Sequence, residues 1–91
     1  QGYIQDEEVS KENKIFLKII EGKSDRNTSF KELCYLLEKM GFQKRIKGDH
    51  HIYFRRGVQE IINIQPRGSD AKPYQVKQVR DLILKYKLEL K

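Results

Sequence analysis

Cysteine is nearly absent from this chain of 91 residues, and the single one, Cys34, excludes an intramolecular disulfide bond. It falls in a helical pattern beside Leu33, Leu36 and Leu37, which predicts a small core residue in a reducing compartment. The sequence also lacks an apolar run long enough to span a membrane, and it lacks a signal-peptide pattern. From these absences we expect a cytoplasmic protein without membrane contact.

Metal ligands are equally scarce. The two histidines, His50 and His51, are adjacent in a probable strand, where successive side chains point to opposite faces. No cluster of acidic residues or cysteines completes a coordination set around them. The sequence therefore predicts no metal site and no small-molecule cofactor.

Positive charge, by contrast, is plentiful. The formal net charge is +6, with 19 Lys and Arg against 13 Asp and Glu. Residues 1–38 carry six positive and eight negative side chains, whereas residues 39–56 carry six against one and residues 66–91 seven against three. This distribution suits a surface that meets phosphates, although a solvated basic face without a partner has the same composition. The length allows one domain with a single modest core.

Capping residues and hydrophobic spacing predict three helices, two of them ahead of a run of strands and one after it. The signals that begin or end these helices are Ser10 and Gly22 for the first, Ser29, Glu32 and Gly41 for the second, and Pro73 for the third. Alternating segments at 42–47, 50–55 and 58–65, separated by tight turns, predict three antiparallel strands. We expect an α+β fold in which helices cover one face of the sheet and water covers the other.

The second strand begins with the two histidines, directly after a Gly48–Asp49 turn. Alternation places His50 on one face with Ile52 and Phe54, and His51 on the other face with Tyr53 and Arg55. We therefore expect His50 to be packed and hydrogen-bonded on the core side, and His51 to be displayed on the wet face. A histidine titrates near neutrality, so one held among Arg45, Lys47 and Arg55 suits proton transfer beside a nucleic-acid phosphate.

Four further stretches carry a family resemblance: Phe30–Phe42, Arg45–Tyr53, Ile61–Pro66 and Lys72–Ile83. Together they resemble the HicA family of toxins from prokaryotic toxin-antitoxin systems, over about two thirds of the chain. The resemblance implies a fold like the double-stranded RNA-binding domain, in the order α-β-β-β-α, over residues 29–90. It leaves an extra N-terminal helix at 10–22 and a flexible leader at 1–9.

The resemblance also implies an activity and a partner. HicA toxins are ribosome-independent mRNA endonucleases, and a HicB antitoxin neutralises them. The catalytic histidine of the family carries over to His51, while Asp49 replaces the serine that is usual in the family. RNA supplies its own nucleophile, the 2′-hydroxyl, so one histidine without a metal is sufficient for cleavage.

Supporting roles are expected from other residues of this basic region. Arg45, Lys47, Arg55 and Lys72 are candidates to bind phosphate, and Tyr53 is a candidate to stack on a base. Each has an alternative interpretation as an ordinary solvated residue. Two other functions remain open: a non-catalytic RNA-binding module that uses Lys72 and Lys77, and an adaptor for an acidic protein.

Overall fold

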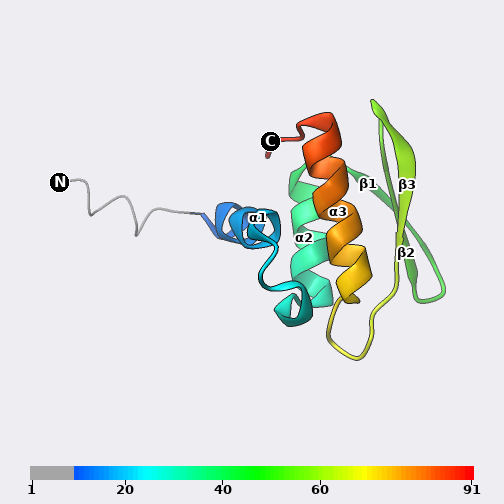
Figure 1. Cartoon of the computed structure of the whole chain (residues 1–91). Helices are drawn as coiled ribbons and strands as arrows, with labels where there is room; N and C mark the ends of the chain where they lie inside the picture. Colours follow the sequence, from blue (N-terminus) through cyan, green and yellow to red (C-terminus); the bar gives the residue numbers. More distant parts are fainter. Residues whose placement is uncertain (1–9) are drawn as a thin grey trace.

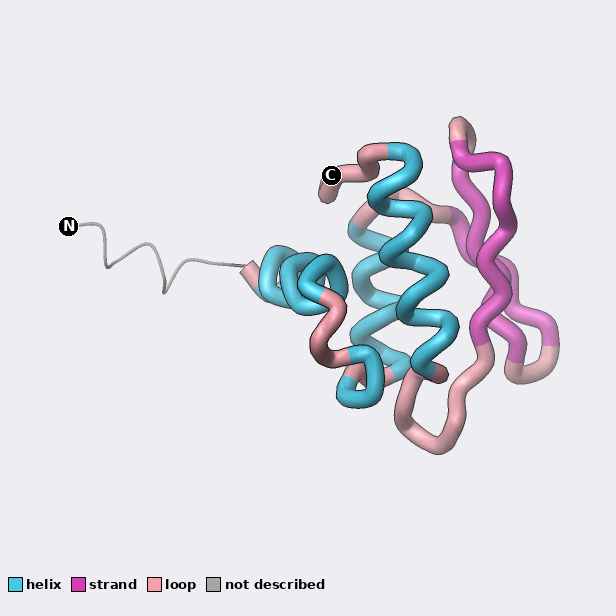
Figure 2. The backbone as a smooth tube through the Cα atoms, viewed as in Figure 1, coloured by secondary structure: helices cyan, strands magenta, loops and turns pink. Residues whose placement is uncertain are grey.

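The computed structural model describes residues 10–91, so the predicted leader at 1–9 lies outside the described residues. The elements follow in the order α1 (Lys11–Glu21), η2 (Asp25–Asn27), α2 (Phe30–Lys39), β1 (Gln43–Lys47), β2 (His50–Arg55), β3 (Val58–Ile64) and α3 (Pro73–Tyr86). This α-α-β-β-β-α order confirms the predicted α+β fold (Figure 1, Figure 2).

The predicted helix ends are confirmed because they depend on local chemistry. The Ser10 side chain accepts a hydrogen bond from the Asn13 N–H, and Ser29 and Glu32 form a reciprocal capping box at the start of α2. Gly22 ends α1 in the left-handed region, with φ of 75°, where a residue without Cβ avoids a steric penalty. Pro73 occupies the first turn of α3, where its missing N–H is not needed.

The sheet is antiparallel with the strand order β1-β2-β3. In β2, His51 pairs with Ile46 on one side and with Ile64 on the other, and Tyr53 pairs with Ile62. All five residues of β1 are exposed, so the sheet ends in an uncovered edge strand.

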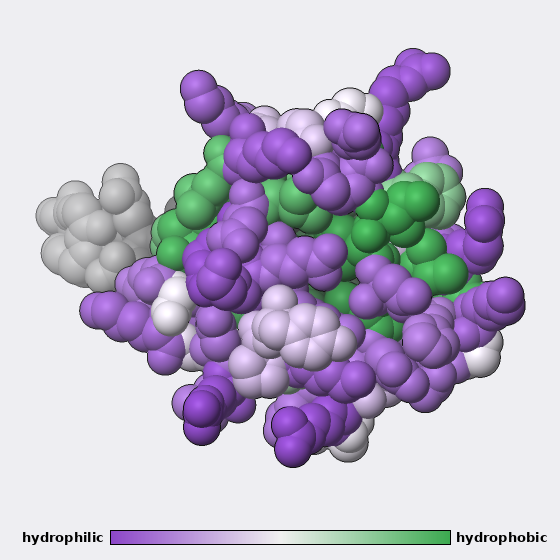
Figure 3. Space-filling model, turned by 45° about the vertical axis from the view of Figure 1, so that its right-hand side comes forward, coloured by the Kyte–Doolittle hydropathy of each residue, from purple (hydrophilic) through white to green (hydrophobic). Residues whose placement is uncertain are grey.

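Three layers build the domain. Helices α2 and α3 lie side by side over one face of the sheet, and α1 packs on the far side of these two helices (Figure 1). The other sheet face is open to solvent. From the sheet side, the surface is mainly hydrophilic with some exposed apolar atoms (Figure 3); on β3, Ile61 is more than half exposed.

The predicted assignment of the two faces of β2 is wrong. Tyr53 is fully buried on the helix-covered face, whereas Ile52 and Phe54 are only partly buried and lie on the open face. The reason is the register, because Tyr53 pairs with Ile62 and His51 with Ile64, and both of these isoleucines point into the core. His51 therefore lies on the helix side of the sheet and His50 on the open side.

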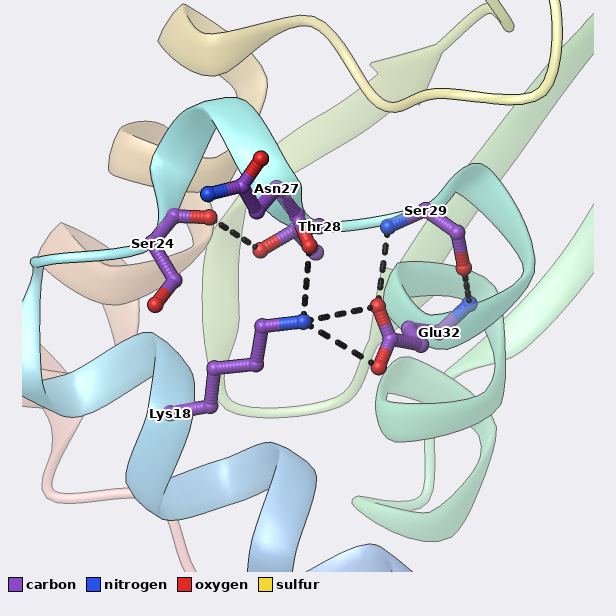
Figure 4. Close-up of polar contacts among 6 residues, drawn as sticks. All are labelled: Lys18, Ser24, Asn27, Thr28, Ser29 and Glu32. Atoms are coloured by element: carbon purple, nitrogen blue, oxygen red, sulfur yellow. Dashed lines mark hydrogen bonds and ion pairs between the residues drawn. The ribbon is translucent and has the colours of Figure 1, made fainter.

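An ion-pair clamp joins α1 to the start of α2 (Figure 4). The Lys18 ammonium donates to the Asn27 carbonyl oxygen at 2.7 Å and to both carboxylate oxygens of Glu32 at 3.1 and 3.3 Å. The same Glu32 carboxylate accepts the Ser29 N–H at 2.9 Å, and the Thr28 hydroxyl donates to the Ser24 carbonyl at 2.8 Å. Helix α1 is thus bonded to the cap that begins α2.

Candidate active site

His51 lies near the start of β2 and faces the first turn of α2. Its ring makes an edge contact with the ring of Phe30, with centroids 4.9 Å apart and planes at 89°. The side chain is half-buried, and its Nδ1 is buried without a hydrogen-bond partner among the described residues. The nitrogen that faces outward is therefore Nε2, which is the atom available to a ligand.

A groove of about 400 Å³ opens beside His51, between the flank of α2 and the sheet. It is lined by His51 and by five residues of α2: Phe30, Lys31, Cys34, Tyr35 and Glu38. Its volume is within the range of roughly 300–1,000 Å³ that is usual for small-molecule sites. The histidine is thus part of a concave surface instead of the flat, wet face that the sequence predicted.

The inner wall of this groove is a small hydrogen-bonded cluster. The Tyr53 hydroxyl and the Lys44 ammonium both donate to Oε2 of Glu38, each at 3.1 Å. Burial raises the pKa of Tyr53 far above its usual value, and the neighbouring Cys34 and Glu38 act in the same direction. Burial also raises the pKa of the Cys34 thiol, so this cysteine stays protonated at neutral pH and is a poor nucleophile.

The predicted base-stacking role of Tyr53 does not fit this position, because its side chain has no exposed surface. Arg45 and Lys47 are exposed, as expected, but they point to the open face of the sheet, away from the His51 side. The Arg45 guanidinium lies over the Phe54 ring on that face, 5.6 Å from its centroid. The structure therefore separates these two cations from His51.

His50 was expected on the core side and is instead about half exposed on the open face, as its side-chain exposure of 46% shows. Its Nδ1 is 3.0 Å from Oδ1 of Asn63, so the predicted hydrogen bonding is confirmed. Its Nε2 is 3.8 Å from Oδ1 of Asp49. His50 and His51 diverge to opposite faces and do not share a ligand position.

Neither Arg55 nor Lys72 is among the residues that line the groove. Arg55 shares the helix-covered face with His51 and is half-buried, with one guanidinium nitrogen, Nη1, buried without a partner. Lys72 precedes α3 and lies close enough to the β1–β2 turn to lower the pKa of Asp49, although the hydrogen bond from Gln65 is the larger cause. Lys72 is therefore near the turn that leads into the histidine strand.

The sequence interpretation missed Lys31, Tyr35 and Glu38 as groove residues. Their spacing on α2 places them on one flank of the helix, which the sequence shows only as its polar side. Which flank faces the histidine depends on how α2 packs on the sheet, so no local signal identifies them. In the part of the chain that the structure describes, no group of three or more His, Cys, Asp or Glu side chains is placed to hold a metal ion.

No helix among residues 10–91 is long and apolar enough to cross a membrane.

Comparisons with curated proteins and with solved structures find no significant match. The sequence model of one protein family does match, over residues 30–86, and its description is HicA toxin of bacterial toxin-antitoxin systems. The matched segment begins at the first residue of α2 and ends at the last residue of α3, so it includes the groove and excludes α1, η2 and the chain ends. Because this match covers more than half of the chain and contains the histidine hairpin, the protein belongs to the HicA toxin family of toxin-antitoxin systems.

Proposed function

We propose that this toxin cleaves RNA without a metal ion, independently of ribosomes, and that His51 transfers the proton. The HicA toxin family is known as a family of RNases. The observation that carries the proposal is the position of His51 in a groove, with its ring in edge contact with Phe30 and its Nδ1 buried, so that Nε2 is the nitrogen left for a ligand. A proton-transfer group must reach the reacting oxygen, and Nε2 has that access.

The chemistry is an internal transesterification. The 2′-oxygen of a ribose attacks the adjacent phosphorus, the bond from phosphorus to the 5′-oxygen breaks, and the products are a 2′,3′-cyclic phosphate and a 5′-hydroxyl. His51 takes the proton from the 2′-hydroxyl or gives a proton to the leaving 5′-oxygen, and water exchanges the other proton. DNA lacks the 2′-hydroxyl and is not a substrate for this reaction.

Positive side chains around the groove stabilise the phosphate as its negative charge increases. Lys31 lines the groove, and Lys44 lies at its wall through its ion pair with Glu38. Both lie on the His51 side of the sheet, whereas Arg45 and Lys47 lie on the open face, and we assign these two to the RNA backbone that flanks the cleaved bond. Lys72 and Arg55 do not line the groove, and we assign them to the flanking RNA backbone as well, whereas Tyr53 is excluded from RNA contact because it is buried.

A partner antitoxin is implied by the family. We propose that it is a HicB-like protein and that it neutralises the toxin by covering the His51 groove. Such a partner would occupy the same opening as the RNA, so binding of the two would be mutually exclusive.

The test is cleavage of a purified, ribosome-free RNA by His51→Ala and by His50→Ala. The first variant is expected to lose cleavage and the second to retain it, because only His51 faces the groove. Thermal melts of both variants check that each is folded. Wild-type cleavage is expected to persist in excess EDTA and to spare a fully 2′-deoxy substrate.

Retention of the wild-type rate by folded His51→Ala would contradict the catalytic assignment. Loss of cleavage in EDTA would indicate a metal-dependent reaction instead. Binding of duplex RNA without any cleavage would favour the non-catalytic RNA-binding module.

A further inference from the structure

The groove beside His51 contains a carboxylate that the cleavage chemistry does not use. Glu38 lies on the last turns of α2, and its side chain is 45% exposed. Its Oε2 accepts from Tyr53 and from Lys44, whereas its Oε1 has no hydrogen-bond partner among residues 10–91. The two bonds hold the carboxylate at Oε2, so Oε1 is the oxygen left to accept from a ligand in the groove that Glu38 lines.

The groove surface between Glu38 and His51 is mainly carbon. Phe30, Cys34 and Tyr35 line it, and the pKa of Cys34 is raised by burial, so the thiol adds no charge. A flat, uncharged ring with N–H donors on its edge matches such a groove, since its faces contact apolar atoms and its edge reaches Oε1.

The rim of the groove is positive. The ammonium groups of Lys11 and Lys39 lie over the Tyr35 ring, 4.5 and 5.5 Å from its centroid, and Lys31 and Lys44 lie at the groove itself. These four cations outnumber the two carboxylates beside them, Glu38 and the Glu12 that accepts from the Tyr35 hydroxyl at 3.0 Å. The excess of positive charge suits an occupant whose ring is joined to phosphates, and it disfavours a basic or purely apolar peptide. The charge pattern therefore favours a nucleotide as the occupant of the groove.

We propose that this groove is a nucleobase subsite in which Glu38 selects the base next to the cleaved bond; the proposal rests on RNA cleavage by His51. Oε1 accepts from the exocyclic amino group that adenine, cytosine and guanine carry. Uracil has no amino group, and its N–H is flanked by two carbonyl oxygens that the carboxylate repels. The subsite thus discriminates against uracil at one position relative to the cleaved phosphate.

The test is cleavage-site mapping on a randomised RNA for the wild type, Glu38→Gln and Glu60→Gln. Glu60 is the matched control, because it accepts from a tyrosine and a lysine, Tyr86 and Lys85, just as Glu38 does, but lies outside the groove. We expect the wild type and Glu60→Gln to disfavour uracil at one position by about fivefold or more, the low end for one polar base contact. Glu38→Gln is expected to cleave with little preference there, because its amide both donates and accepts. Thermal melts of the three proteins check that they are equally folded.

A second measurement does not depend on cleavage. The four nucleoside monophosphates are added to folded His51→Ala while NMR signals are recorded, and the amino-bearing bases are expected to shift signals of Tyr35 and Glu38 more than uridine monophosphate does. If the wild type does not cleave RNA, the proposed function is refuted but the subsite is not, because the titrations detect nucleotide binding to the groove without cleavage. Unchanged uracil discrimination in Glu38→Gln, or titrations that leave the groove signals unmoved, would overturn the subsite.

Discussion

Replacement of Glu32 by alanine tests the clamp between α1 and α2. One carboxylate accepts the Ser29 N–H at 2.9 Å and receives the Lys18 ammonium at both oxygens, while both ion-pair side chains are about 30% exposed. Loss of half of a capping box costs about 1 kcal/mol, and loss of a partly exposed ion pair costs up to about 1 kcal/mol. We therefore expect Glu32→Ala to lower the free energy of unfolding by about 1–2 kcal/mol.

Calorimetry or circular dichroism melts at neutral pH measure this loss. For a domain of this size, each 1 kcal/mol lowers the melting temperature by about 4–8 °C. Lys18→Ala is expected to lose the ion pair and the bond to the Asn27 carbonyl but to keep the capping box. Lys14→Ala is the control, because Lys14 is an exposed lysine of the same helix.

The effect of Glu32 also has a predictable pH dependence. Burial acts to raise the pKa of Glu32, but the Ser29 N–H bond and the Lys18 pair outweigh it and hold the pKa below its ordinary value of 4.5. A carboxyl with a lowered pKa in the folded state stabilises the protein above pH 4.5, and that stabilisation is lost as the pH falls through the lowered pKa. The difference between wild type and Glu32→Ala should therefore shrink in acid. A neutral-pH difference below about 0.3 kcal/mol, or one that is unchanged in acid, would refute the clamp.

Two further predictions concern the sheet. Tyr53→Phe removes a buried hydroxyl that donates to a carboxylate, so we expect a loss of about 1 kcal/mol in thermal melts; an unchanged or raised melting temperature would contradict the role of this bond. Reversal of Arg45 and Lys47 to glutamate is expected to weaken RNA binding. It should also reduce the slope of the logarithm of the binding constant against the logarithm of salt concentration by about two, as measured by filter binding. The same reversal at exposed Lys14 and Lys23 is the control, and equal losses there would remove the open face from the RNA-binding surface.

The sequence predicts the parts of the fold that depend on near neighbours. Ser10, Ser29 and Pro73 act within one helical turn, and the structure confirms all three helix starts. Which face of β2 is buried depends instead on which β3 residues lie opposite. The register that pairs Tyr53 with Ile62 cannot be predicted from the sequence of β2 alone.

Tyr53 is a core residue that the sequence pattern placed on the surface. Alternation with Ile52 and Phe54 assigned Tyr53 to the wet face, and the partner that allows its hydroxyl to be buried, Glu38, lies 15 positions earlier on another element. Glu38 was missed as a groove residue for the same reason, since its importance arises only when α2 packs beside β2. Long-range pairing is therefore the information that the sequence patterns did not supply.

The docking of α1 has a consequence for the order in which the helices become fixed in the fold while the chain is synthesised. The Arg80 guanidinium on α3 donates to Asp25 at 2.8 and 3.1 Å and to the Ile19 carbonyl at the end of α1 at 3.1 Å. An isolated helix of 11 residues is marginal in water, so α1 depends on these tertiary bonds to persist. Residue 80 leaves the ribosome long after residue 19, and at about 5–20 residues per second the interval is several seconds. The helix that is synthesised before the other two is thus among the last to be fixed in place.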